Sequence, residues 1–385
     1  MNTRIYFDHA ATTPIDESIL KDMFETAKNC YGNPSAVYSE GVFAKRIVNE
    51  ARNTVAKALG AYEKEIIFTS GGSEADNLAL IGVMKANKDK GRHLITTSFE
   101  HKAVLESAEY LKKEGFRVTY IEPESNGIID VGKVERAICS DTVLISVMSV
   151  NNELGTIQPI EKIGKLSKER NVYFHTDSVQ AFGKIEINPS KLGIDLLSAS
   201  GHKIGGPKGT GFLYVKRGTR IESLIHGGSQ EYGLRAGTEN VIGLLGLKDA
   251  VEASFSKRKE NLQYVKELTE SFRSGLKENI DGIEFNNESL NSLPGFVNVS
   301  FEGVEGSSLL IQLDIKGLCA SSGSACTLLD DKPSHVLKAI GLADERIRSS
   351  VRFSLGAENT PSEVERAVEI IKDSVEYLRK IKKGF

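Results

Sequence analysis

The chain has 385 residues, of which 40% are hydrophobic and 26% are charged, and its formal net charge is −3. This length predicts two domains with large apolar cores. The small net charge argues against a general attraction to nucleic acid or anionic membranes, and no apolar run approaches the ~20 residues of a membrane helix. Because no apolar signal segment follows the first arginine, we expect a cytoplasmic protein.

Short apolar runs alternate with helical patterns through the first two-thirds of the chain. Runs such as "TVLISVMSV" are apolar on both faces, which is typical of strands covered by helices on both sides. The alternation predicts a large α/β domain over residues 13–255 with a mostly parallel, seven-stranded sheet. One strand is expected to be antiparallel, since only a short glycine-rich link joins the last two runs. The expected strands are 65–70, 93–98, 117–123, 142–150, 172–178, 194–200 and 209–216, with helices at 73–88 and 101–115.

The rest of the chain predicts a smaller α+β domain, formed by residues 1–12 and 256–385. A long helical pattern covers 238–280, and an amphipathic helix follows Pro361. Between them we expect strands at 282–287, 296–303 and 350–356 and a helix near 305–315.

The cysteines are widely spaced. No CxxC pair occurs, which argues against a disulfide framework and against a zinc or iron–sulfur cage. The four are Cys30, Cys139, Cys319 and Cys326.

Gly71-Gly72-Ser73 separates an expected strand from an expected helix. Ser73 is a predicted N-cap, with Asp76 at capping-box spacing. A helix start with flanking glycines binds anions well, because its free N–H groups are accessible to the ligand. Taken alone, the segment also fits an ordinary helix cap. The nucleotide motifs G-x-G-x-x-G and G-x-x-x-x-G-K-[ST] do not match here or at "GHKIGGPK", which argues against NAD or ATP.

An acid and a lysine follow two neighbouring expected strands. Asp177 ends one run, with Gln180 three residues on, and Ser200-Gly-His202-Lys203 ends the next. Pyridoxal phosphate requires such a pair: the amine bonds to its aldehyde, and the carboxylate keeps the ring nitrogen protonated so that the ring withdraws electrons from the substrate Cα. Each residue alone is commonplace, as a strand-end acid and a solvated lysine. The order of phosphate loop, acid and lysine favours the cofactor site.

A longer ordered set of motifs carries a family resemblance. The chain resembles the NifS/IscS-like cysteine desulfurases of the class V aminotransferase group, which are fold-type I pyridoxal-phosphate enzymes. The matching segments are "YFDHAATTP", "YGNPSA", "FTSGGSEADNLAL", "EHKAVL", "VNNELGTIQPI", "FHTDSVQAFGK", "SGHKIGGPKGTGFLYV", "GGSQEYGLRAGTEN", "SSGSAC", "PSHVLKAIG" and "VRFSLG".

The resemblance implies roles for individual residues. Lys203 bonds to the cofactor and later moves the Cα proton. Asp177 pairs with the ring nitrogen, and Gln180 meets the phenolic oxygen. His101 stacks on the ring and assists proton transfer. The residues implied to hold the phosphate are Gly72, Ser73, Ser200, His202 and Thr238, the last reaching the cofactor of the other subunit in a homodimer.

Asn152 and Arg352 are implied to hold the substrate carboxylate. A guanidinium suits this role, because it grips a carboxylate with two parallel hydrogen bonds. Simpler structural interpretations exist for three of the assigned residues. His101 at a helix start fits capping, Arg352 in an alternating strand fits a solvated face, and Thr238 fits an N-cap.

Cys326 decides the reaction. It lies among small residues followed by charges and Pro333, a composition that predicts a mobile surface loop. Cys319 ends an apolar stretch and is expected to be structural. In the family, the cysteine of "GSAC" takes the substrate sulfur as a persulfide. The resemblance therefore implies that L-cysteine becomes L-alanine and that Cys326 passes sulfur to an acceptor protein, an iron–sulfur scaffold or a tRNA-thiolation enzyme.

Some positions depart from the family pattern. His9 stands where asparagine is frequent, Ser73 replaces a threonine, and "TLLDDK" follows Cys326 where small residues are common. A class V aminotransferase or selenocysteine lyase on the same fold is the alternative enzyme. A scaffold or metal-binding protein that uses the cysteines and histidines is the non-enzymatic alternative.

Overall fold

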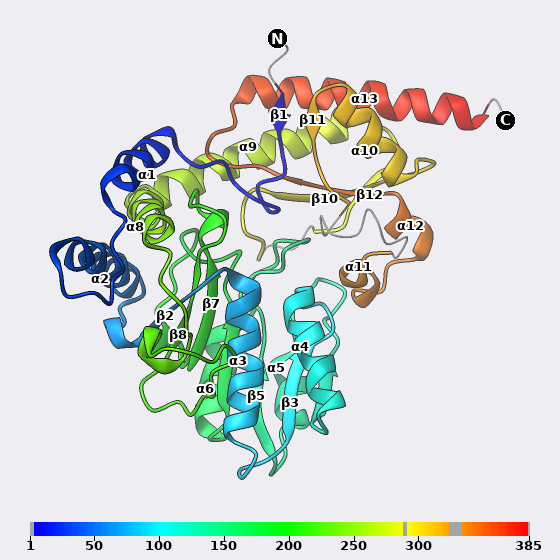
Figure 1. The fold of residues 1–385 in the computed structure, drawn as a ribbon. Helices are drawn as coiled ribbons and strands as arrows, with labels where there is room; N and C mark the ends of the chain where they lie inside the picture. The colour runs from blue at the N-terminus through cyan, green and yellow to red at the C-terminus, as the bar shows by residue number, and fades with distance from the viewer. Residues whose placement is uncertain (1–3, 288–290, 323–332, 384–385) are drawn as a thin grey trace.

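A seven-stranded sheet lies at the centre of the fold (Figure 1). The computed structural model describes residues 4–287, 291–322 and 333–383. The strand order is β2-β8-β7-β6-β5-β3-β4, and the neighbours pair in parallel except at β8, which is antiparallel to both β7 and β2. The predicted mostly parallel sheet with one antiparallel strand is therefore confirmed. Its strands are β2 (Ile66–Thr69), β3 (His93–Thr97), β4 (Arg117–Ile121), β5 (Thr142–Ser146), β6 (Tyr173–Asp177), β7 (Leu196–Ser200) and β8 (Gly211–Val215).

Both faces of this sheet are buried. Ile66 and Phe68 point into one apolar core and Ile67 into another, because successive strand residues face opposite sides. This explains the continuous apolar runs in the sequence. The core of Ile67 includes residues of α3 (Gly72–Ala86) and α4 (Lys102–Lys113). The other core includes residues of α2 (Ser39–Leu59), α5 (Val131–Ala137), α6 (Ile160–Glu169) and α8 (Val241–Ser256).

Two helices near the N-terminus were not predicted from the sequence. α1 (Glu17–Asn29) carries apolar residues at the spacing of one helix face, with Ile19 buried and Met23 half-buried, so its pattern was present in the sequence. α2 ends at Gly60, which takes the left-handed conformation with φ 65° that favours glycine.

A second group of elements packs around a smaller antiparallel sheet of order β12-β10-β9. Its core joins Ile5 and Phe7 from the start of the chain to residues from the last third. β1 (Ile5–Tyr6) pairs in parallel with β11 (Leu318–Cys319), so distant segments lie side by side (Figure 1). The boundaries at 12/13 and 255/256 stay a prediction. The other elements are β9 (Ile283–Phe285), β10 (Phe296–Phe301), β12 (Ser350–Ser354), α9 (Arg258–Asn279), α10 (Gly306–Ile315), α11 (His335–Ala339), α12 (Asp344–Arg348) and α13 (Pro361–Lys383).

The longest helices are amphipathic. In α9 the buried positions include Val265, Leu268 and Phe272, at the three- and four-residue spacing of one helix face. Among residues 4–287, 291–322 and 333–383, no helix has both the length and the apolar character needed to cross a membrane.

Candidate cofactor and substrate site

The sheet brings the predicted acid and lysine to the same edge. Asp177 is the last residue of β6, Ser200 is the last residue of β7, and these strands are parallel neighbours. Lys203 follows directly in a 3₁₀ turn, Gly201–Lys203. The predicted convergence at the carboxyl ends of the strands is confirmed, as expected for an open α/β sheet.

The amine of Lys203 is held by backbone carbonyls of the N-terminal segment. Its Nζ donates to Ala10 O at 2.6 Å and to Ala11 O at 2.7 Å. Burial lowers the pKa of Lys203 to about 7, and the nearby cations of Arg352 and Lys184 act in the same direction. A large fraction of this amine is therefore neutral near pH 7 and free to react as a nucleophile.

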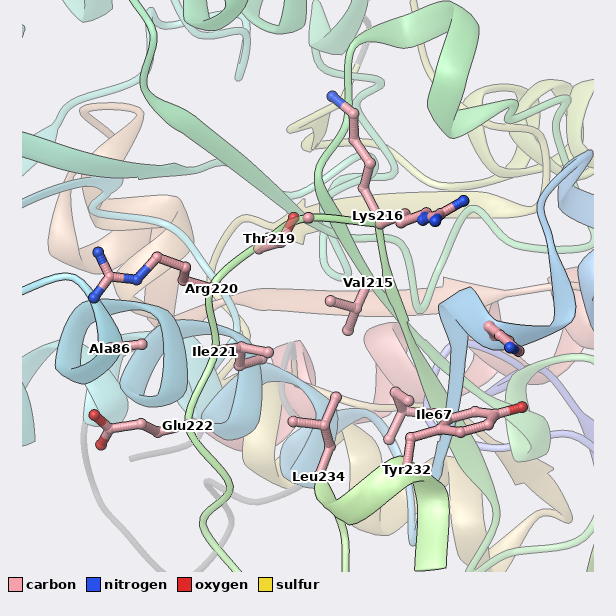
Figure 2. Close-up of a pocket in the computed structure, with 13 residues that line it drawn as sticks. Ile67, Ala86, Val215, Lys216, Thr219, Arg220, Ile221, Glu222, Tyr232 and Leu234 are labelled. Carbon is pink, nitrogen blue, oxygen red and sulfur yellow. The ribbon is translucent and has the colours of Figure 1, made fainter.

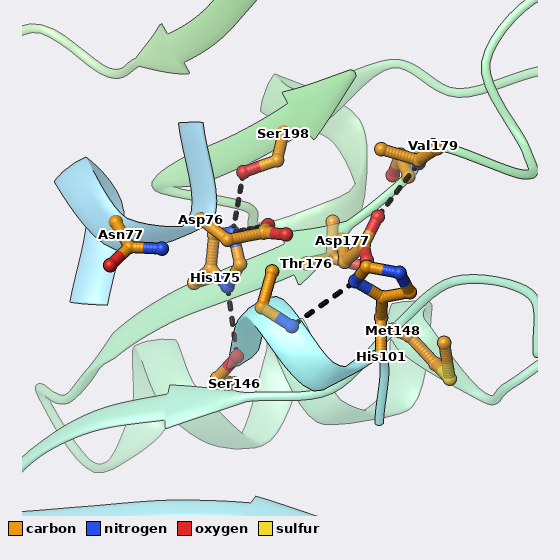
Figure 3. Close-up of polar contacts among 12 residues, drawn as sticks. Asp76, Asn77, His101, Ser146, Met148, His175, Thr176, Asp177, Val179 and Ser198 are labelled. Atoms are coloured by element: carbon orange, nitrogen blue, oxygen red, sulfur yellow. Dashed lines mark hydrogen bonds and ion pairs between the residues drawn. The ribbon is translucent and has the colours of Figure 1, made fainter. Parts of the chain in front are cut away.

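Asp177 is buried beside His101 (Figure 3). Its Oδ1 accepts from the Val179 N–H at 2.9 Å. Burial raises the pKa of Asp177, while His101 and Lys203 counteract that shift. His101 is the N-cap of α4 and accepts from Ala103 N at 3.2 Å, so the capping interpretation holds and the ring also borders the site.

A second carboxyl, that of Asp76, lies close to Asp177 and His101 (Figure 3). Asp76 Oδ1 is 3.6 Å from His175 Nε2, and both side chains are buried. Burial lowers the pKa of His175 to about 3, so its ring is neutral. Burial and the proximity of Asp177 raise the pKa of Asp76 well above its usual range. The capping-box prediction for Asp76 is therefore wrong, because this residue faces the sheet rather than the start of the helix.

The start of α3 differs from the prediction. Gly71, not Ser73, is the N-cap, and the helix begins at Gly72. Gly71 has φ 155°, which side chains rarely adopt, and this lets the chain turn into the helix two residues early. Ser73 lies exposed in the first turn. Glu74 does not crowd an anion there, because its carboxylate accepts from Ser70 N at 2.8 Å and from Arg235 Nε at 2.9 Å.

Two glycines let the start of α3 pack closely against the segments that follow β6 and end β7. A Cβ on Gly72 would lie 2.6 Å from Val179 Cγ2, so this position excludes a side chain. A Cβ on Gly71 would lie 3.7 Å from Ser200 Oγ, which places the serine hydroxyl beside the glycine pair. The predicted phosphate residues Gly72 and Ser200 thus lie together at a helix N-terminus.

The other two predicted phosphate residues are placed differently. His202 Nδ1 lies 3.2 Å from Thr12 Oγ1, and burial lowers the pKa of His202 to about 4. Thr238 is exposed on the loop before α8. It is not an N-cap, since Asn240 caps α8 by accepting from Gly243 N.

Arg352 is buried rather than solvated. It is 2% exposed, its Nη1 donates to Asn152 O at 2.9 Å, and its Nη2 donates to Asp8 Oδ1 at 2.8 Å. The two predicted carboxylate ligands, Arg352 and Asn152, are therefore in contact. Within the described ranges, Arg352 Nε and Asn152 Oδ1 are buried without a hydrogen-bond partner. An unpaired buried donor on a cation is costly, which favours a site built for a ligand.

Cys326 lies outside the described residues. The chain enters that segment beside the carboxylate site, because Ser321 N donates to Arg352 O at 3.1 Å. Cys319 is half-buried in β11, and Arg4 donates to its Sγ at 3.4 Å, which fits the predicted structural role.

Cavities and clusters elsewhere do not include the acid and the lysine. A hollow of about 570 Å³ beyond β8 is lined by Ile67, Lys216, Arg220 and Tyr232 among others (Figure 2). At the opposite edge of the sheet, His93, Cys139 and Asp141 have ligand atoms within 4.8 Å of one another. The Arg117 guanidinium donates to this thiol at 2.9 Å and to this carboxylate at 2.7 Å, so both groups already have a cationic partner.

Comparisons with known proteins agree on one group. The family model "Aminotransferase class-V" matches residues 5–367. The "Putative cysteine desulfurase IscS 1" of Bacillus subtilis (strain 168) is 47% identical over 97% of this chain and 99% of its own length. The structure titled "NIFS-LIKE PROTEIN" superposes with a TM-score of 0.92, at 37% identity over 97% of this chain and 100% of that one. The structure titled "SspA in complex with cysteine" has a TM-score of 0.83, at 39% identity over 93% of this chain and 100% of that one.

Proposed function

The chain belongs to the class V aminotransferase family and, within it, to the NifS/IscS-like cysteine desulfurases on the pyridoxal-phosphate fold, and we propose from this how its residues convert L-cysteine to L-alanine and carry the sulfur. The observation that carries the proposal is the pair of a half-buried lysine and a buried acid at the strand ends. A lysine whose pKa is lowered to about 7 lies within electrostatic range of buried Asp177, beside a glycine-lined helix start.

These residues fit pyridoxal phosphate. Asp177 would hold the ring nitrogen, Gly72 and Ser200 would hold the phosphate with Ser73 and His202, and Lys203 would hold the aldehyde. Gln180 and His101 would contact the ring oxygen and the ring face. When bound, the cofactor supplies an electron-withdrawing ring that makes the substrate Cα proton acidic and the Cβ–S bond cleavable.

The residues around the ring have separate roles in substrate binding and proton transfer. Arg352 and Asn152 bind the carboxylate of L-cysteine, through the donors on the guanidinium and the side-chain amide. Lys203 would hold a neutral amine near the substrate Cα and take the proton there. Its low pKa suits this step, because a general base works best with a pKa near the working pH.

Cys326 completes the reaction in this proposal. Its thiolate attacks the substrate sulfur, so that an S–S bond forms as the Cβ–S bond breaks. The electron pair of the broken bond stays on the carbon skeleton, which is protonated and leaves as L-alanine. No external oxidant or reductant is consumed. The persulfide on Cys326 then passes its outer sulfur to an acceptor for iron–sulfur cluster or thio-cofactor synthesis.

We also propose a homodimer. Thr238 is exposed on the loop before α8, which leaves it free to reach the phosphate of a second subunit. Tyr232 and Ile225, from the same stretch of chain, are exposed at 52% and 43%. Both side chains are available for contact with a partner subunit.

The function is tested by product stoichiometry. Purified enzyme with pyridoxal phosphate, L-cysteine and excess thiol reductant is expected to release L-alanine and sulfide in equal amounts. Alanine formed from a keto acid without sulfide would instead assign aminotransferase activity and overturn the proposal. The same assay with L-selenocysteine distinguishes a selenocysteine lyase, which would turn over only that substrate.

Asp177→Asn and Asp76→Asn make a matched pair of buried substitutions. Asp177→Asn is expected to lower kcat/KM for L-cysteine about 10²- to 10³-fold, because a neutral amide no longer stabilises the charged ring. Asp76→Asn is expected to change kcat/KM less than about 3-fold, since burial and the neighbouring Asp177 already shift that carboxyl toward its neutral form. Steady-state kinetics at pH 7 measure both. Losses of the same size in the two variants would contradict the assignment of the ring contact to Asp177.

A further inference from the structure

A second lysine borders the site and has no role in the mechanism proposed for Lys203. Lys184 lies four residues after Gln180, on the turn that follows β6, and its Nζ donates to Gln180 Oε1 at 3.3 Å. The lysine is half-buried, and its Nζ lies 6.0 Å from the centre of the Phe296 ring. A charged amine in this position differs from a surface lysine, because its head group faces the interior.

The other end of the Gln180 amide faces the catalytic amine. Gln180 Nε2 donates to Ala10 O at 2.9 Å, and Lys203 Nζ donates to the same oxygen at 2.6 Å. A row of contacts therefore runs from Lys184 through Gln180 and Ala10 to Lys203. The two ends of a side-chain amide have nearly the same shape but opposite hydrogen-bonding character. An ammonium group only donates, so contact with it selects the oxygen end.

We propose that Lys184 is a positioning residue that fixes the Gln180 amide with its nitrogen toward Lys203 and the ring bound there. The proposal rests on the function proposed above. The amide nitrogen carries two hydrogens, and the Ala10 carbonyl takes one of them. The second hydrogen is available to an acceptor on the ligand, such as a phenolic oxygen. A reversed amide would set its oxygen against the Ala10 carbonyl, where two acceptors repel.

The charges around Lys184 come from several elements. Glu358 raises its pKa and Arg352 lowers it, while burial has the largest effect and brings the pKa to about 8. In turn, Lys184 lowers the pKa of His9, His202 and Lys203. The ammonium form therefore predominates at pH 7 and is lost as the pH rises through about 8, which sets the upper pH limit for its hold on the amide.

The test compares three variants at position 184 with a surface control. Lys184→Met removes the donor, Lys184→Gln keeps a donor without charge, and Lys184→Arg keeps both. Lys191→Met removes an exposed lysine from the neighbouring turn. The first readout is the pH titration of the visible absorption band of the enzyme loaded with pyridoxal phosphate, which needs no substrate. The midpoint is expected to rise by about one pH unit in Lys184→Met, because a cation and an oriented donor near the chromophore are lost.

Lys184→Gln is expected to shift the midpoint by less, and Lys184→Arg and Lys191→Met to titrate like the native enzyme.

The second readout is the pH dependence of colour formation when the cofactor-free protein is mixed with pyridoxal phosphate. Formation requires neutral Lys203, so its midpoint is expected near pH 7 in the native protein and higher in Lys184→Met.

A double-mutant cycle separates positioning from simple charge. Lys184→Met is expected to lower kcat/KM for L-cysteine about 10-fold in the native background, as for loss of a hydrogen bond to a charged group. In a Gln180→Leu background the same change is expected to matter less than about 2-fold, because the residue through which it acts is gone. An unshifted band titration in Lys184→Met, or equal losses in both backgrounds, would overturn the proposal. If the native enzyme lacked desulfurase activity, the proposed function would fail while the titration still tested Lys184.

Discussion

Lys203→Ala is expected to abolish conversion of L-cysteine to L-alanine, with a loss of at least about 10⁴-fold in kcat, because this amine is both nucleophile and general base. The amine is held by two carbonyls, Ala10 O and Ala11 O, and burial has already lowered its pKa to about 7. Alanine formation at pH 7 and the visible spectrum of the loaded protein measure the effect. The band of the native enzyme should be lost or displaced, since the covalent bond to the protein is gone.

Lys208→Ala is the matched control. Lys208 lies in the same glycine-rich stretch but is exposed, so its removal should leave both spectrum and turnover unchanged. Turnover in Lys203→Ala above about one-tenth of the native value would show that another group moves the Cα proton, and the site assignment would fail.

Cys326→Ala is expected to reduce sulfide release from L-cysteine to the level of a blank, while the visible spectrum of the bound cofactor stays native. The thiol takes no part in holding the cofactor in the proposed mechanism, but it is the atom to which the substrate sulfur moves. A sulfide assay with reductant, run beside an absorption spectrum, separates the two properties. Because the nucleophile must be a thiolate, native activity should rise with pH until the thiol is ionised.

Cys319→Ala provides the comparison within the same stretch of chain. Cys319 pairs with the N-terminal strand and contacts Arg4, so its loss is expected to affect stability rather than sulfur transfer. Undiminished sulfide release in Cys326→Ala would move the assignment toward the alternative enzymes of this fold.

The meeting of Asp177, Ser200 and Lys203 could be predicted because it depends on one rule. The carboxyl ends of neighbouring parallel strands fall on one edge, so residues just past two such strands become neighbours whatever their distance in sequence. Most of the seven strands could also be predicted, since runs buried on both faces are continuous and apolar, whereas the edge strand β4 is only partly buried.

The contacts that Lys203 and Arg352 make with distant segments could not be predicted from the sequence. The carbonyls of Ala10 and Ala11 hold Lys203 through the backbone, and a backbone group leaves no signal in side-chain chemistry. Asp8, the ion partner of Arg352, lies in the N-terminal segment "YFDHAATTP", far from Arg352 in sequence, and only the fold brings the two together. Lys184 follows Gln180 by one helical turn, and that spacing is the one signal that could have suggested their contact.

Local rules failed where tertiary contacts overrode them. Ser73 and Asp76 have the spacing of a capping box, yet Gly71 takes the cap position and Asp76 is buried against the sheet. The carboxylate of Glu74 accepts from Ser70 N, one residue ahead of the cap position, so no capping box forms at this helix start. Helix α3 is buried on most sides, so position 76 faces His175 rather than solvent.

The pairing of β1 with β11 has a consequence for synthesis on the ribosome. Ile5 and Tyr6 emerge first, but their partners Leu318 and Cys319 emerge near the end, and Arg352 later still. A nascent or prematurely terminated chain can therefore build the central sheet before Arg352 is made. Such a chain would hold the reactive lysine without the guanidinium that orients an amino acid. The first residues also lie against the strand that leads toward Cys326, and an affinity tag is therefore better fused behind α13 than ahead of Ile5.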